Sequence, residues 1–135
     1  MHTSSCLPRP PFDPALVLEP SSPGPVYSTP QGHLLAGDCL EHLAHIRPEV
    51  VDAIFADPPF NLKKTYGEGC ADDMSAQDYL AWSKRWIDAC LRTLKPGGAL
   101  FLYNIPQWNI PLGAYLMEQG LTLRHSIAVE MKNGC

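Results

Sequence analysis

The sequence contains no run of about 18 consecutive apolar residues, the length that a membrane-spanning helix needs. Its first residues also lack the basic segment and the long apolar stretch that open a secretory signal. Charged residues account for 18% of the chain, below the ~25% typical of globular proteins, which disfavours a disordered protein driven by charge. With 135 residues, the sequence predicts one soluble domain that makes no contact with membranes and is located in the cytoplasm.

The five cysteines are odd in number, irregularly spaced and never arranged as C-x-x-C. This spacing disfavours a disulfide framework and a zinc site, and the scattered histidines offer no ligand cluster, so no metal is predicted. Ten basic residues against 14 acidic ones give a net charge of −4, which argues against binding nucleic acid through bulk charge alone. A local basic loop is compatible with that balance.

Proline is concentrated at the start of the sequence, where eight of the 14 prolines precede Gln31. Prolines at this density lack backbone donors and interrupt helices and strands. We therefore predict a Pro-rich disordered arm over residues 1–31 and a folded region over residues 32–135.

Beyond the arm, apolar residues alternate between the period of strands and the period of helices. The expected strands are 33–36, 50–56, 99–103 and 121–131, and the expected helices are 40–46, 75–94 and 108–119, with a loop over 61–74. This alternation predicts an α/β fold with a mainly parallel sheet and helices on both faces. The helix over 75–94 carries one broad apolar stripe, so its residues Tyr79, Trp82 and Trp86 are expected in the core.

Polar residues follow three of the expected strands: Asp38 after the first, Asp57 after the second and Asn104 after the third. In parallel α/β sheets, ligands bind beyond the carboxyl ends of the strands. We therefore expect these three residues on one rim of the sheet. Asp38 has a second interpretation, because an aspartate at that place can simply cap the following helix.

Asp57-Pro58-Pro59-Phe60 is the segment with the clearest chemical meaning. The two prolines hold φ at about −65° and keep the preceding residue extended, so the segment is a rigid strand end. It presents a carboxylate, the Pro58 carbonyl and an aromatic face, a set that suits a planar amine on a heterocycle. The two oxygens would accept the amine's N–H bonds and draw its lone pair out of conjugation, while Phe60 stacks on the ring. The alternative is a Pro-Pro turn in which Asp57 caps the next helix.

Three segments occur in a characteristic order: Gly37-Asp38-Cys39-Leu40, then Asp57-Pro58-Pro59-Phe60-Asn61-Leu62, then Leu94-Lys95-Pro96-Gly97-Gly98. Together they resemble the amino-methylating DNA methyltransferases. The order resembles their permuted β subclass, whose members use S-adenosylmethionine to methylate adenine N6 or cytosine N4. The resemblance covers residues 32–134 and implies a partial Rossmann-like methyltransferase fold.

The resemblance also assigns roles to individual residues. It implies a catalytic segment of Asp57, Pro58, Pro59 and Phe60, a cofactor site of Asp38, Cys39 and Asp57, and contacts to a flipped base in double-stranded DNA from Phe60, Asn61, Lys63, Lys64 and Tyr66. Aspartate at the head of the motif favours adenine N6, because the N4-cytosine relatives more often carry serine there. The two lysines can equally lie in a solvated loop.

The sequence lacks the Phe-x-Gly-x-Gly loop with which complete members of the β subclass hold the methionine end of the cofactor. We therefore expect the amino-terminal part of a methyltransferase, with half of the cofactor site absent and no activity on its own. Three alternatives stay open: an N4-cytosine enzyme, an RNA amino-methyltransferase, and a non-catalytic half-domain that only binds DNA or a partner chain. A homodimer and a restriction endonuclease partner are both compatible with the resemblance.

Overall fold

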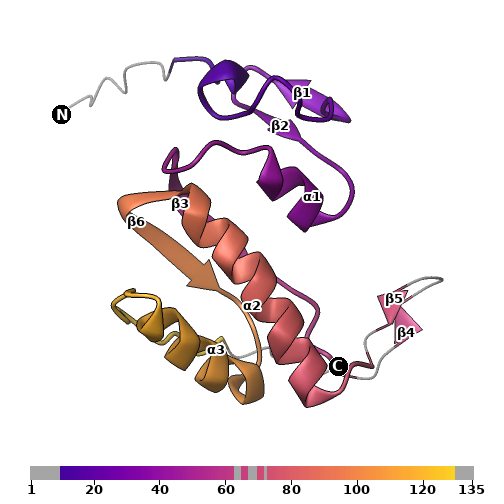
Figure 1. Ribbon diagram of the computed structural model, residues 1–135, viewed down its shortest axis with the longest axis vertical. Helices are drawn as coiled ribbons and strands as arrows, with labels where there is room; N and C mark the ends of the chain where they lie inside the picture. Colours follow the sequence, from indigo (N-terminus) through magenta and orange to yellow (C-terminus); the bar gives the residue numbers. More distant parts are fainter. Residues whose placement is uncertain (1–9, 63–64, 67–69, 72, 130–135) are drawn as a thin grey trace, which may run out of the picture. The chain divides into compact units, whose positions relative to one another are not determined.

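The computed structural model describes residues 10–62, 65–66, 70–71 and 73–129. The chain divides into two compact units, and Figure 1 labels their helices and strands. The first unit takes in residues up to Phe55 together with Arg85–Phe101, and the second takes in Ala56–Lys84 and the residues from Leu102 onward. Within the described ranges, no helix is long and apolar enough to cross a membrane.

A βαβ unit supplies the parallel strand pair of the structure. Strand β3 (Val51–Ala56) is followed by helix α2 (Ala76–Thr93) and strand β6 (Leu94–Leu102), and β3 and β6 are hydrogen-bonded neighbours. The Val50 N–H donates to the Thr93 carbonyl at one end of the pair, and the Tyr103 N–H donates to the Ala56 carbonyl at the other. Because both bonds follow the same order along the two strands, the pair is parallel. The predicted α/β character with a parallel sheet is confirmed for this pair.

The remaining elements are short, apart from one helix. The first unit holds the 3-10 turn η1 (Pro14–Leu16), strands β1 (Tyr27–Thr29) and β2 (Gly32–Leu34), and helix α1 (Cys39–Ala44). The second holds β4 (Thr65–Tyr66), β5 (Cys70–Ala71) and helix α3 (Pro106–Glu118). The helices predicted over 40–46, 75–94 and 108–119 therefore occur with small shifts at their ends.

The sequence predicted a four-stranded sheet, and two of its four strands are wrong. Residues 33–34 belong to β2, which pairs antiparallel with β1 rather than joining the parallel pair. Residues 121–129, the described part of the last expected strand, form no strand, and Leu123 and Ile127 are 67% and 78% exposed. A strand needs a neighbour to satisfy its backbone groups, and alternating apolar residues alone do not supply one.

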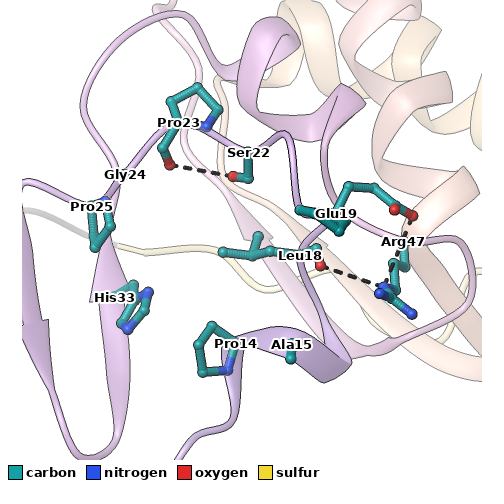
Figure 2. A pocket seen from close by; sticks show the side chains of 11 residues that line it. Pro14, Ala15, Leu18, Glu19, Ser22, Pro23, Gly24, Pro25, His33 and Arg47 are labelled. Carbon is teal, nitrogen blue, oxygen red and sulfur yellow. Dashed lines mark hydrogen bonds and ion pairs between the residues drawn. The ribbon is translucent and has the colours of Figure 1, made fainter.

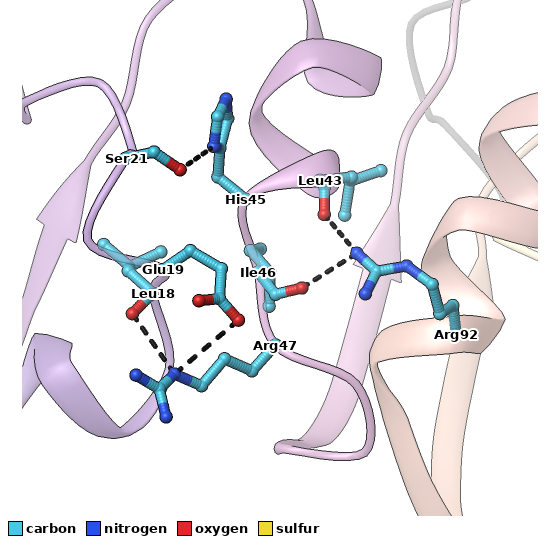
Figure 3. Close-up of polar contacts among 8 residues, drawn as sticks. All are labelled: Leu18, Glu19, Ser21, Leu43, His45, Ile46, Arg47 and Arg92. Carbon is cyan, nitrogen blue, oxygen red and sulfur yellow. Dashed lines mark hydrogen bonds and ion pairs between the residues drawn. The ribbon is translucent and has the colours of Figure 1, made fainter.

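Residues 10–31 contain short elements in the structure, and the predicted disorder of residues 1–31 stays a prediction. The β1–β2 hairpin turns at Pro30, and the segment is joined to the stretch after α1 by a Leu18–Ile46 bridge. The Arg47 side chain adds a bond from Nε to the Leu18 carbonyl at 3.4 Å, as Figure 3 shows. Prolines lack N–H groups, but carbonyls here still accept bonds from neighbouring segments. Residues 1–9 of the predicted arm lie outside the described residues.

The same segment borders a shallow pocket of about 350 Å³ in the first unit. Figure 2 shows prolines around it, with His33 and Arg47 among the other side chains. One nitrogen of His33, Nδ1, is buried without a hydrogen-bond partner among the described residues. The pocket is mostly apolar, and none of the residues singled out in the sequence line it.

The apolar stripe of α2 is buried, as its spacing predicts. Tyr79, Trp86, Ile87 and Cys90 are all buried, whereas Lys84, Arg85, Asp88 and Arg92 are exposed on the same helix. Trp82, also expected in the core, is only half-buried. Ser75 begins the helix: its hydroxyl accepts from the Asp78 N–H at 3.1 Å and donates to the Asp78 carboxylate at 2.7 Å. The helix therefore forms from its own cap and its burial pattern together.

Arg92 links the end of α2 to the end of α1. Its Nη2 donates to the carbonyls of Leu43 and Ile46, at 2.6 and 2.8 Å, and Figure 3 shows the guanidinium reaching both. These carbonyls lie in and just after the last turn of α1. The Leu43 carbonyl also accepts from the Ile46 N–H at 3.1 Å, and the Ile46 carbonyl lies beyond the helix, where intrahelical donors end.

We expect Arg92→Ala to lower the free energy of unfolding by about 1–2 kcal/mol, because two charge-assisted hydrogen bonds are lost at a partly exposed site. Urea denaturation measures this loss. Arg85→Ala is the matched control, since Arg85 is an exposed cation on the same helix. An equal loss in both variants would contradict the capping role.

Candidate active site

The end of strand β3 positions the Asp-Pro-Pro-Phe segment. Strand β3 ends at Ala56, so Asp57 is the first residue beyond its carboxyl end. Asn104 is the second residue beyond the carboxyl end of β6. The bond from the Tyr103 N–H to the Ala56 carbonyl, at 2.9 Å, joins the two strand ends immediately before these residues. Both polar residues therefore follow the ends of neighbouring parallel strands, as the sequence predicts for Asp57 and Asn104.

Two buried aromatic side chains hold the carbonyls of the second half of the motif. The Tyr79 hydroxyl donates to the Pro59 carbonyl at 2.6 Å, and the Trp108 Nε1 donates to the Phe60 carbonyl at 2.7 Å. The Phe60 ring packs against Tyr103, with ring centroids 5.6 Å apart and planes inclined by 57°. All of these residues belong to the second unit.

The first half of the motif has no comparable partners. The Asp57 side chain is exposed, and neither its carboxylate nor the Pro58 carbonyl accepts a hydrogen bond from the residues that the structure describes. The segment thus divides into two anchored carbonyls and two open acceptors. An amine with two N–H bonds matches the open pair chemically.

Asn61 closes the base of the loop that follows the motif. Its Oδ1 accepts from the Met74 N–H at 2.8 Å, and its Nδ2 donates to the Met74 carbonyl at 2.9 Å. Its φ of 53° lies in the left-handed region, which asparagine tolerates better than most residues. Because both ends of the amide are engaged by the backbone of Met74, the predicted contact of Asn61 with a base remains a prediction.

The other residues predicted to contact DNA are less defined. Tyr66 lies in β4, opposite Cys70 of β5 in an antiparallel pair. Lys63 and Lys64 fall outside the described residues. Their contacts with DNA stay predictions.

Asp38 and Cys39, the predicted cofactor contacts, stand at the start of α1 in the first unit. The Asp38 Oδ1 accepts from the Leu40 N–H at 2.8 Å, so Asp38 does cap this helix. Its second carboxylate oxygen accepts nothing from the described residues, which leaves one acceptor for a ligand. Desolvation raises the pKa of the Cys39 thiol, and the Asp38 carboxylate adds to the rise.

The pKa of the Cys90 thiol is also raised, and more strongly. Burial raises the pKa of its thiol to about 11, and Cys39 contributes a smaller part of the rise. Both thiols are therefore protonated at neutral pH, which disfavours either as a nucleophile.

We expect iodoacetamide at pH 8 to alkylate Cys39 at least about tenfold faster than Cys90 in the folded chain, because only the exposed residue can meet the reagent. Peptide mass spectrometry measures both rates. In 8 M urea, about the same rate is expected for the two, since unfolding removes the difference in burial. Equal rates in the folded chain would contradict the burial of Cys90.

Sequence reasoning missed the role of Tyr79 and Trp108. It assigned Tyr79 to the core stripe of α2, and for Trp108 it favoured helix packing over contact with a base. The available signal was chemical: a buried tyrosine or tryptophan must find a partner for its polar atom. Tyr79 is 1% exposed and Trp108 is 5% exposed. Carbonyls of a Pro-Pro segment at a nearby strand end are acceptors of the required kind.

Comparison with known proteins agrees with this geometry. A family model described as DNA methylase matches residues 51–135, which include the whole motif and both anchoring aromatic residues. The chain therefore belongs to the DNA methylase family, a family of DNA methyltransferases.

Curated relatives are similar over about half of the chain or more. The sequence is 53% identical over 110 residues to the Type II methyltransferase M.BamHI of Bacillus amyloliquefaciens, a match that covers 82% of this chain and 26% of the relative. It is 33% identical over 70 residues to the Type II methyltransferase M.HpaI of Haemophilus parainfluenzae, covering 52% and 22%. It is 35% identical over 78 residues to the DNA adenine methyltransferase YhdJ of Escherichia coli K12, covering 58% and 26%. The chain thus spans about a quarter of the length of these relatives.

Proposed function

We propose that this chain supplies the amine-binding motif of a DNA methyltransferase, which transfers a methyl group from S-adenosylmethionine to the exocyclic amine of a flipped base. The observation that carries the proposal is the division of the motif into anchored and open acceptors. Pro59 and Phe60 have their carbonyls bonded to Tyr79 and Trp108, whereas the Asp57 carboxylate and the Pro58 carbonyl accept nothing from the described residues.

The proposed chemistry follows from those two open acceptors. A planar amine would donate one N–H to the Asp57 carboxylate and the other to the Pro58 carbonyl. Both bonds favour a nitrogen whose lone pair has left conjugation with the ring and can attack an electrophile. They strengthen as positive charge develops on the nitrogen, so they stabilise the transition state more than the ground state. Phe60, steadied by Tyr103, would stack on the base and offset part of the cost of unstacking it from the duplex.

Adenine N6 is the proposed acceptor, with cytosine N4 as the alternative. The aspartate at the head of the motif supports adenine, and so does the similarity to a relative named as a DNA adenine methyltransferase. Two other relatives are named only as Type II methyltransferases. Those two names support a restriction endonuclease as a further proposed partner.

The residues present fit only part of the methyl donor. Asp38 keeps one free carboxylate oxygen, which suits a hydroxyl or amine donor of the adenosine portion. The Cys39 backbone beside it is the second proposed contact. The sequence holds no Phe-x-Gly-x-Gly segment for the methionine portion, so the donor set is incomplete. We propose residues 32–135 as the amino-terminal part of a Rossmann-like catalytic domain that needs such a segment, with residues 1–31 preceding it.

A chimeric enzyme tests the proposal. The chain would be joined to the part of M.BamHI that lies beyond the matched region, which gives a completed enzyme. It would be incubated with unmethylated double-stranded DNA and S-adenosylmethionine, and the digested nucleosides would be analysed by mass spectrometry. N6-methyladenine is the expected product. N4-methylcytosine would support the alternative base, and methylation of RNA but not DNA would contradict the proposal.

A further inference from the structure

Side chains of α2 and α3 anchor the motif through hydrogen bonds, and the chemistry of each group decides whether it donates or accepts. Asn104 fixes the first step: its Oδ1 accepts from the Ile105 N–H at 2.8 Å, so its Nδ2 faces the Tyr79 hydroxyl, at 2.9 Å. An amide nitrogen can only donate, so the Tyr79 oxygen accepts that bond. The single hydroxyl proton of Tyr79 is then directed to the Pro59 carbonyl, at 2.6 Å. The order of donors and acceptors is thereby determined.

Trp108 provides the second anchor. Its indole nitrogen is a donor only, and it reaches the Phe60 carbonyl at 2.7 Å. Its ring packs against Tyr79 with centroids 4.5 Å apart and planes inclined by 42°, so the two anchors also support each other. Asn109, on the same helix, donates from Nδ2 to the Asn104 carbonyl at 2.7 Å and ties the network to α3.

These bonds act on the torsions that the prolines leave open. The rings of Pro58 and Pro59 fix φ at both positions, but ψ of Pro59 and ψ of Phe60 stay soft. Each ψ sets the direction of one carbonyl, and those are the two carbonyls that Tyr79 and Trp108 hold. The direction of the Phe60 ring and of the preceding acceptors depends on these torsions.

We propose that Tyr79 and Trp108 are positioning residues of the methyltransferase reaction. They hold the carbonyls of Pro59 and Phe60 so that the Asp57 carboxylate, the Pro58 carbonyl and the Phe60 ring keep the arrangement that receives the amine. This inference rests on the proposed function of the motif. It adds to that proposal two residues that do not touch the base.

Conservative variants separate positioning from packing. Tyr79→Phe removes the bond to the Pro59 carbonyl together with the bond from Asn104, and Trp108→Phe removes the bond to the Phe60 carbonyl. Both variants keep an aromatic ring. In the completed enzyme, each variant is expected to lower kcat about tenfold, since misdirected groups lose the gain from orientation, while KM for S-adenosylmethionine stays within about twofold. Tyr27→Phe is the matched control, because it removes a hydroxyl from exposed strand β1, outside the site, and should leave kcat unchanged.

A double-mutant comparison tells whether the anchors act through the motif. With Asp57→Asn already present, adding Tyr79→Phe is expected to cost less than about twofold, because the group that it positions is gone. If Asp57→Asn abolishes turnover and Tyr79→Phe alone leaves kcat unchanged, the positioning role is overturned while the proposed function stands. If Asp57→Asn leaves turnover unchanged, the proposed function has failed, and the exchange measurement below decides the anchoring.

Hydrogen exchange of the 135-residue chain gives a readout that needs no activity. The Met74 amide, which donates to Asn61 directly after the motif, is expected to exchange about tenfold faster in Tyr79→Phe, whereas the Ile54 amide in β3 should keep its rate. Unchanged exchange at Met74, or an equal rise at all amides, would overturn the proposal, since the second result indicates general destabilisation. If Tyr79→Phe does not fold, Trp108→Phe answers the same question through the Phe60 carbonyl.

Discussion

Asp57→Ala in the completed enzyme is expected to lower kcat by about a thousandfold, the range found when a group that stabilises a developing charge is removed. The carboxylate is exposed and accepts nothing from the described residues, so its loss should leave the fold intact. Binding of S-adenosylmethionine should change by less than about threefold, because the lost interaction forms mainly in the transition state. Single-turnover kinetics with a DNA duplex would measure the chemical step directly.

Asp52→Ala is the matched control for that experiment. Asp52 is an exposed carboxylate on β3, five residues before Asp57, and it pairs with Lys95 at 2.6 Å. A surface ion pair of this kind contributes only about 0–1 kcal/mol to stability, so turnover should stay normal. Near-normal turnover in Asp57→Ala, or an equal loss in both variants, would remove Asp57 from its assigned role.

The parts of the fold that the sequence predicted correctly depend on local patterns. In β3, a β-branched run ends in Asp57, and α2 begins at a Ser75–Asp78 cap, so both elements carry their own start and stop signals. Their order along the chain then favours a parallel pair with β6, and that pair is present. Local patterns and topology rules were sufficient for this part.

The strands that were predicted wrongly depend on partners far along the chain. His33 in β2 pairs with Ser28, a residue inside the segment that was expected to be disordered. Residues 121–129 alternate in polarity but have no neighbouring strand among the described residues. Pairing is a property of two segments, and the apolar pattern of one segment cannot specify it.

The candidate site also contains residues that the sequence identified and residues that it did not. Asp57 and Phe60 could be identified because the chemical groups of the motif come from consecutive residues. Tyr79 could not, because a helical stripe predicts burial and says nothing about where a hydroxyl points. Its bond to Pro59 spans 20 positions, and the bond from Trp108 to Phe60 spans 48. Only the fold brings these donors to the motif.

A polypeptide of the 135 residues alone is expected to show no binding of S-adenosylmethionine at micromolar concentrations and no methyl transfer to DNA. The sequence offers Asp38 for the adenosine portion and no Phe-x-Gly-x-Gly segment for the methionine portion. Several hydrogen bonds of ~0.5–1.5 kcal/mol each are therefore missing, with more for those to charged groups, and affinity should fall by orders of magnitude. Isothermal titration calorimetry and a labelled-methyl assay measure the two quantities.

The completed enzyme is the control, since it regains the absent segment and should bind the cofactor under the same conditions. Self-association of the 135-residue chain is a second expected result, to be measured by analytical ultracentrifugation. Phe55 on β3 and Phe101 on β6 are 71% and 52% exposed in the first unit, and exposed apolar strands promote association. Micromolar binding of S-adenosylmethionine together with methyl transfer by the 135-residue chain would falsify the expectation. It would mean that residues other than a glycine-rich loop hold the methionine portion in this protein.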